Sequence, residues 1–328
     1  MMRKERSIIN RRDFLRASAA GAGAFYLSGE SLAESCSASR EELLPRRVLG
    51  KTGEKLSIIG FGGMVVAGVK QADADAVVAR SVEKGINYFD VAPGYGDAEL
   101  KLGPALKPFR KDVFLACKTA ERDKEGAEKE LHRSLKRLQT DHFDLYQFHN
   151  LDDPIDDVEV AFSKDGAVQT FIKAKEKGLI KHIGFSAHST QVALKVMKEF
   201  DFDSIMFPIN FCCHYKGKLS QKVLAEANKR GMGIIAIKSM VRERLPVPES
   251  THENYPKCEY EPVVDPFLAE DVLRWTLSQD GVTAAIPPGD ENLFRLALQI
   301  GPNITPITDE GTEKLKRLAA KLEPLFPM

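Results

Sequence analysis

Short apolar runs alternate with amphipathic stretches along the chain from about Leu56 onward. The runs are rich in β-branched and aromatic residues and are bounded by turn residues, which is typical of buried parallel strands. Eight runs show this pattern, at residues 56–63, 88–93, 112–119, 143–149, 182–187, 204–211, 233–240 and 283–288.

Stretches with helical spacing lie between the runs, among them residues 73–85, 126–140, 190–200, 218–231 and 271–281. Several end in glycine after a lysine or arginine, a signal for a helix C-terminus. Eight strand-helix units over roughly 250 residues predict an α/β fold, the (β/α)8 TIM barrel. A doubly wound open sheet is the alternative, but it needs a G-x-G-x-x-G turn after a strand, and the sequence contains none.

Two further elements flank the eight units. Residues 46–57 place a Lys-Thr-Gly turn between short apolar pieces, which predicts a β-hairpin that would cap the bottom of the barrel. Residues 310–325 predict an extra C-terminal helix after the eighth unit. The barrel domain is therefore expected to span residues 46–328.

The N-terminal segment resembles a twin-arginine export signal. Arg11 and Arg12 precede Phe14 and Leu15, an Ala/Gly-rich run follows, and small residues end at Ala33. The expected division is a signal peptide at residues 1–33 and a linker at 34–45. This implies recognition by the twin-arginine export machinery and a periplasmic or otherwise exported protein. An amphipathic N-terminal helix with chance arginines is the other interpretation.

The composition mainly excludes classes of partner and of structural site. The formal net charge is zero and no block of like charges occurs, so nothing suggests a nucleic-acid partner. No apolar stretch is long enough for a stable membrane span. The five cysteines are an odd number and do not form a disulfide framework. Cys212-Cys213-His214 has no accompanying C-x-x-C motif, so structural cysteines are favoured over a metal site.

Four polar residues lie at or just after the ends of successive predicted strands. They are Asp90, Tyr95, Lys118 and His149. Active sites of such barrels form at the C-terminal ends of the strands, so these side chains are expected to meet on one rim. A buried lysine requires a carboxylate, which Asp90 supplies. The ammonium is expected to lower the pKa of Tyr95, making it a general acid, while His149 orients a substrate oxygen.

Two segments containing these residues resemble signatures of the aldo-keto reductase family. They are NYFDVAPGYGDAELKLGPAL at 87–106 and EKELHRSLKRLQTDHFDLYQFH at 128–149. The resemblance runs from about Arg46 to the C-terminus. It implies that Tyr95 is the proton donor, Lys118 tunes it, Asp90 holds Lys118, and His149 orients the carbonyl. It also implies reduction of an aldehyde, ketone or keto-sugar by NADPH or NADH, or oxidation of the alcohol, with NADP as the family default.

The same resemblance implies a set of cofactor contacts around the barrel mouth. They are Gly62, Gly63, Met64, Ser186, His188, Lys238, Arg242, Gly289 and Gln299, with Arg244 and Arg295 as further candidates. Ala187 replaces an asparagine of the family pattern, for which His188 is expected to substitute. Met206 stands where a glutamine is common, and Lys238 where many members have a stacking tyrosine. The long connection at 241–267 is expected to be a functional lid or a solvated loop.

Two other function classes compete with a reductase. A cofactor-sensing protein with little turnover is suggested by Ala187, Met206 and Lys238. A metal-dependent isomerase or hydrolase needs several carboxylates and histidines at strand ends, and only Asp90 and His149 fit that description. No metal site is therefore expected.

Overall fold

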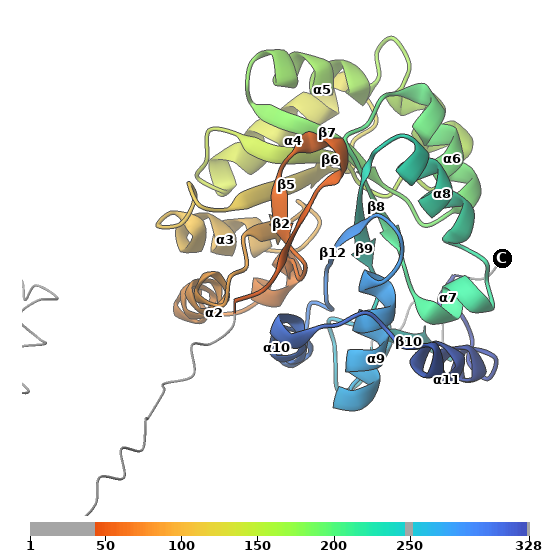
Figure 1. The fold of residues 1–328 in the computed structure, drawn as a ribbon. Coiled ribbons are helices and arrows are strands. Elements are labelled where there is room, and N and C mark those ends of the chain that lie inside the picture. The colour runs from red at the N-terminus through yellow and green to blue at the C-terminus, as the bar shows by residue number, and fades with distance from the viewer. Residues whose placement is uncertain (1–42, 247–251, 327–328) are drawn as a thin grey trace, which may run out of the picture. The chain divides into compact units, whose positions relative to one another are not determined.

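The computed structural model describes residues 43–246 and 252–326 (Figure 1). The predicted signal peptide, and the linker up to residue 42, lie outside the described residues. In the described part of the chain no helix is long and apolar enough to cross a membrane.

A parallel sheet of eight strands forms the centre of the fold, in the order β12-β9-β8-β7-β6-β5-β4-β3. The strands are β3 (Phe61–Gly62), β4 (Tyr88–Asp90), β5 (Phe114–Thr119), β6 (Phe143–Phe148), β7 (Ile180–Ser186), β8 (Ser204–Pro208), β9 (Gly233–Ile237) and β12 (Val282–Ala285).

The sheet closes on itself through the residues just before β3. The Gly60 amide donates to the Ala285 carbonyl (2.9 Å), and the Ala285 amide donates to the Ile58 carbonyl (2.8 Å). These bonds form a parallel bridge between Ile59 and Ala285, which joins the first strand to the last. The predicted TIM barrel is confirmed.

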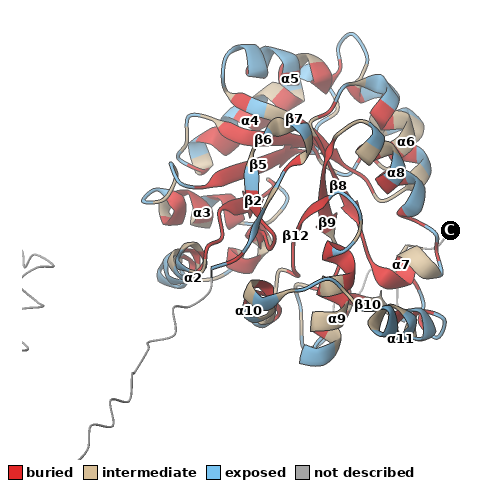
Figure 2. Cartoon of the chain, in the orientation of Figure 1, coloured by how far each residue is buried: buried red, intermediate tan, exposed pale blue. Residues whose placement is uncertain are grey.

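Helices follow the strands and cover the outside of the barrel (Figure 1). They are α2 (Gln71–Glu83), α3 (Ala98–Leu106), α4 (Lys124–Arg137), α5 (Ala167–Glu176), α6 (Thr190–Glu199), α8 (Gln221–Lys229), α9 (Pro266–Leu277) and α10 (Glu291–Ile300). The predicted extra C-terminal helix is α11 (Asp309–Ala319), and a short helix α7 (Phe211–Tyr215) precedes α8. Figure 2 shows the helix faces toward the sheet buried and the outer faces exposed, as their amphipathic sequences require.

The predicted N-terminal hairpin consists of β1 (Arg46–Val48) and β2 (Lys55–Ser57), which pair antiparallel. The apolar run 56–63 therefore divides between two sheets, since its start pairs with β1 and its end enters the barrel. Leu49 and Leu56 are fully buried in the barrel interior, among side chains that include Tyr88, Phe114 and Ile235. The hairpin thus fills the end of the barrel where the strands begin.

The long connection after β9 contains a second hairpin, which the sequence pattern did not predict. Its strands are β10 (Val241–Arg244) and β11 (Tyr260–Pro262), paired antiparallel with an irregularity between Val241 and Glu243. Residues 247–251 of this connection lie outside the described residues. In the described part of the connection, β10 pairs with β11, and Cys258 and Tyr260 are buried against Val241 and Leu293.

Gly50 and Gly53 in the first hairpin turn provide a matched test of this end of the barrel. Both have positive φ, +48° and +81°. A Cβ at Gly50 would lie 2.3 Å from the Gly233 nitrogen, whereas a Cβ at Gly53 would meet nothing within 4 Å. Gly50→Ala should lower the free energy of unfolding by about 2–4 kcal/mol, and Gly53→Ala by about 1 kcal/mol. Urea unfolding of the two variants measures the difference, and equal losses would contradict the packing described here.

Candidate active site

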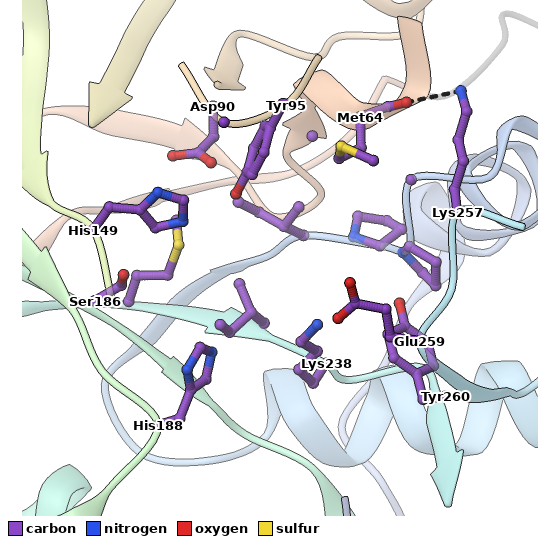
Figure 3. A pocket seen from close by; sticks show the side chains of 18 residues that line it. Met64, Asp90, Tyr95, His149, Ser186, His188, Lys238, Lys257, Glu259 and Tyr260 are labelled. Carbon is purple, nitrogen blue, oxygen red and sulfur yellow. Dashed lines mark hydrogen bonds between the residues drawn. The ribbon is translucent and has the colours of Figure 1, made fainter. Parts of the chain in front are cut away.

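A cavity of about 380 Å³ opens at the C-terminal ends of the barrel strands. Its volume lies in the range of small-molecule sites. Its lining combines polar side chains with apolar ones, as Figure 3 shows. The lining residues are Gly62, Met64, Asp90, Gly94, Tyr95, His149, Ser186, His188, Met206, Ile237, Lys238, Lys257, Glu259, Tyr260, Ile286, Pro287, Pro288 and Gly289.

The four strand-end residues singled out from the sequence come together here: Asp90, Tyr95 and His149 line the cavity, and Lys118 contacts Asp90 and Tyr95 without lining it. Asp90 ends β4, Tyr95 lies in the loop that follows, Lys118 belongs to β5, and His149 directly follows β6. Lys118 is completely buried and forms an ion pair with Asp90. Its ammonium also lies 3.5 Å from the Tyr95 hydroxyl. The His149 ring faces the Tyr95 ring edge-on, with 5.7 Å between centroids.

Gln147 supports the ion pair, and the sequence reasoning missed it. Its amide nitrogen donates to Oδ1 of Asp90 (3.0 Å), while Lys118 binds the other carboxylate oxygen. The Tyr88 hydroxyl also approaches Oδ1 at 3.4 Å. The signal was the period of two in a strand, because Gln147 and His149 lie on the same side of the chain. Asp90 is thus held by three neighbours.

The pKa values around the buried ion pair differ in part from those expected from the sequence. Burial alone would lower the pKa of Lys118, but Asp90 and Tyr95 outweigh it and raise that pKa to about 12. The pKa of Tyr95 is raised, not lowered as the sequence suggested. Its burial disfavours the tyrosinate more strongly than the Lys118 ammonium favours it. Tyr95 is therefore a neutral phenol that carries its proton.

His149 is a neutral imidazole at ordinary pH. Burial, and then the charge of Lys118, lower its pKa to about 3. The backbone beside it is fixed by Arg122, whose guanidinium donates to the carbonyls of His149 (2.8 Å) and Asn150 (3.0 Å). Asn150 has a φ of +59°, and its amide donates to the Ser186 hydroxyl (2.8 Å). The imidazole is thus held at the cavity by contacts to its own backbone.

The comparisons with known proteins identify the family. A sequence model described as the Aldo/keto reductase family matches residues 58–261, more than half of the 328 residues. The chain belongs to this family.

Curated relatives of this aldo/keto reductase include enzymes named for sugar derivatives. L-galactose dehydrogenase of Arabidopsis thaliana is 30% identical over 208 residues, which cover 58% of this chain and 63% of the relative. 6-Dehydroglucose reductase of Novosphingobium aromaticivorans is 28% identical over 204 residues, covering 54% of this chain and 64% of the relative. The chain thus spans less than two thirds of the length of these two relatives.

A solved structure shows the same fold. The holo form of an aldo-keto reductase from Bacillus halodurans matches with a TM-score of 0.65 at 24% identity, covering 87% of this chain and 98% of that one. This likeness shows the fold that the chain shares with that protein.

The residues that the resemblance assigned to the cofactor fall into two groups. Six line the cavity, namely Gly62, Met64, Ser186, His188, Lys238 and Gly289. Three do not. Gly63 is buried against Val91, Arg242 lies in β10 and pairs with Glu243 (3.2 Å), and Gln299 lies beside Arg295 in a separate cavity between α2 and α10.

The second hairpin supplies lining residues that the sequence did not indicate. Lys257, Glu259 and Tyr260 enter the cavity from it. The Lys257 ammonium donates to the carbonyls of Met64 (2.8 Å) and Val65 (3.0 Å), across 193 residues of chain. This contact is drawn in Figure 3 and ties the hairpin to the loop after β3. Lys257 and Glu259 lie in an irregular segment, and Tyr260 begins a strand of three residues, which is too short to give a periodic pattern.

The cavity suits a nicotinamide ring in size and polarity. Ile237, Ile286 and Pro287 contribute apolar lining, and Ser186 and His188 contribute groups that can form hydrogen bonds. Gly289 passes so close to Met64 that a Cβ would lie 2.4 Å from that residue's Cβ, so only glycine fits there.

A metal ion has no evident site within residues 43–246 and 252–326. No cluster of three or more His, Cys, Asp or Glu side chains there is arranged to hold an ion. Cys212 and Cys213 are buried in α7, and the His214 ring is hydrogen-bonded to Ser220 (2.8 Å).

The lowered pKa of His149 predicts a pH dependence of stability. The unfolded chain takes up a proton on this residue below pH of about 6.5, whereas the folded chain resists until about pH 3. Folding stability is therefore lost as the pH falls through that window, by at most about 1.4 kcal/mol per pH unit from this residue. His149→Asn should flatten the loss. Urea unfolding at several pH values measures the slope, and identical slopes in both proteins would refute the buried neutral imidazole.

Proposed function

We propose that this aldo/keto reductase transfers a hydride between a nicotinamide cofactor and a sugar-like carbonyl compound, with Tyr95 as the proton donor. The observation that carries the proposal is the Tyr95 hydroxyl, 3.5 Å from the buried Lys118 ammonium and facing the neutral His149 across the cavity. The names of the two sugar-related relatives support an aldehyde, ketone or keto-sugar as the substrate class.

Tyr95 is suited to donate a proton during reduction. Burial raises its pKa, so the phenol is protonated when a carbonyl compound enters. As the carbonyl oxygen gains negative charge, it takes the Tyr95 proton. The tyrosinate left behind is stabilised by the Lys118 ammonium, whose own pKa of about 12 keeps it charged. In the oxidation direction the same tyrosinate accepts the proton from an alcohol.

His149 is suited to orient the carbonyl. With its pKa lowered to about 3, the ring is neutral and offers one N–H donor. Donation to the carbonyl oxygen would fix the substrate beside Tyr95 and stabilise developing negative charge. A neutral donor does so without competing with Tyr95 for the role of acid.

The cofactor supplies the hydride when bound. We propose that Ser186 and His188 hold its carboxamide side, with Gly62 and Met64 on the rim opposite Lys238. The start of α10, which follows Gly289 of the cavity lining, carries acidic residues. Asp290 already caps the helix by accepting from Asn292 and Leu293, and Arg295 is paired with Glu291 (2.7 Å). These charges disfavour an added 2′-phosphate and favour NAD over the family default NADP.

Replacement of the phenol tests the reaction. Tyr95→Phe should lower kcat by about 10²–10⁴-fold, since the general acid is lost, with little change in cofactor Kd. The control is Tyr146→Phe, which also removes a buried hydroxyl. The Tyr146 ring packs against Phe143 and Phe171, and the residue does not line the cavity. Stopped-flow oxidation of NADH and NADPH with aldehydes, ketones and keto-sugars measures turnover. Equal activity of Tyr95→Phe and wild type would overturn the mechanism. Tight cofactor binding without turnover in the wild type would favour a sensing protein.

We further propose that the protein is exported by the twin-arginine pathway. The support is the sequence alone, with Arg11 and Arg12 before an Ala/Gly-rich run and small residues ending at Ala33. Export in the folded state suits an enzyme that must load a nucleotide where it is made.

Substituting the arginine pair tests export. Arg11→Lys combined with Arg12→Lys should retain the uncleaved chain in the cytoplasm of a bacterial host that has the machinery, because the paired guanidinium groups are what the pathway recognises. The control is Arg16→Lys, which lies outside the pair. Cell fractionation and N-terminal sequencing give the result. A chain that remains cytoplasmic without any substitution would show the proposal to be wrong.

A further inference from the structure

Lys238 occupies an unusual backbone position at the edge of the cavity. It directly follows β9 and has a φ of +62°, a left-handed conformation that costs a non-glycine residue about 1–2 kcal/mol. Asn210 holds this conformation, because its amide nitrogen donates to the carbonyls of Lys238 (3.1 Å) and Val241 (2.7 Å). Strain maintained by neighbouring contacts is a pointer to function. Here its effect is to direct the Lys238 side chain into the cavity (Figure 3).

The surroundings of the Lys238 amine favour its neutral form. Its nitrogen lies 4.8 Å from the centre of the Tyr260 ring, and Ile237 lines the cavity beside it. No ion pair joins it to a carboxylate within residues 43–246 and 252–326. Burial lowers the pKa of Lys238, and the charge of Glu259 offsets this only in part. A desolvated lysine of this kind is the form of the residue that attacks carbonyl groups.

The other two lysines at the cavity are in different states. Lys118 is paired with Asp90, and its pKa of about 12 makes it a permanent ammonium. Lys257 donates to the Met64 and Val65 carbonyls, so its nitrogen is turned toward the loop after β3. Lys238 is therefore the lysine among these three whose nitrogen is directed into the cavity with no hydrogen-bonded partner among the residues that the structure describes.

We propose that Lys238 is a nucleophilic amine that forms a reversible imine with aldehydes admitted to the cavity. Its nitrogen attacks the carbonyl carbon, a C–N bond forms, and the carbonyl π electrons move to oxygen. Glu259, which also lines the cavity, carries two protons in turn from the nitrogen to that oxygen, the first to form the carbinolamine and the second as the C–O bond breaks. Departure of the oxygen as water leaves the C=N bond. Amine and aldehyde give imine and water, with no oxidation or reduction.

This activity goes beyond hydride transfer and requires no cofactor. It rests on the proposed function only in that the cavity must admit a carbonyl compound. It also implies that an aldehyde can occupy the cavity in two ways, with its carbonyl at Tyr95 or at Lys238.

Reductive trapping tests the inference. The full chain, freed of nucleotide, is incubated with propionaldehyde and sodium cyanoborohydride at pH 7, and the alkylated lysines are quantified by peptide mapping. Because burial lowers the pKa of Lys238, more of its amine is neutral at pH 7 than in an exposed lysine. We therefore expect Lys238 to be labelled faster than exposed lysines such as Lys111. Lys164→Arg, at an exposed lysine that does not line the cavity, should leave this labelling unchanged, and Lys238→Arg should abolish it.

Labelling of Lys238 at the rate of exposed lysines, or none, would overturn the imine. This outcome is separable from failure of the reductase, which is measured as NADH or NADPH oxidation with the wild-type chain. Glu259→Asp provides a second readout, because it keeps the negative charge near Lys238 but withdraws the carboxylate that carries the protons. It should slow Lys238 labelling severalfold while the exposed lysines react as before, and unchanged labelling would remove Glu259 from the step.

Discussion

The buried ion pair between Lys118 and Asp90 is the interaction on which the cavity depends. Transfer of two charges out of water costs several kcal/mol for each ion, and only close pairing with further hydrogen bonds offsets it. The structure provides these bonds through Gln147, which donates to Asp90, and through the Tyr88 hydroxyl. Removal of either charge would leave the other buried and unpaired. The pair also fixes a positive charge beside the Tyr95 hydroxyl.

The register of the barrel produces this arrangement. Asp90 is paired with Ala116, and Lys118 is paired with Gln147 on the next strand. Lys118 therefore lies on β5, between β4, which carries Asp90, and β6, which carries the Gln147 that binds Asp90. A shift of one residue in either pairing would turn the lysine toward the helices, because side chains alternate along a strand. Because the sheet is closed by the Ile59–Ala285 bridge, each of these strands is paired on both sides, which constrains its register.

Much of this could be predicted from the sequence, because strand runs, hairpin turn and strand-end side chains are local signals. Asp90, Tyr95, Lys118 and His149 were found in that way. The pKa of Tyr95 was predicted with the wrong sign, because the sequence shows a neighbouring charge but not the burial that outweighs it. The β10–β11 hairpin escaped prediction because its pairing joins irregular segments. Contacts such as Lys257 to Met64 depend on loop positions across the barrel mouth, which no spacing encodes.

Lys118 and Lys238 both lie at this site, but their pKa values shift in opposite directions, and one carboxylate accounts for the difference. Lys118 and Lys238 both lose water on folding, which by itself lowers the pKa of each. Asp90 reverses the shift for Lys118, whereas Lys238 meets the Tyr260 ring, whose attraction for a cation is far weaker than that of a desolvated carboxylate. An ammonium beside Tyr95 stabilises the negative charge that proton transfer creates. An aromatic wall beside Lys238 leaves its amine the more easily deprotonated of the two, so placement of one acid separates the two roles.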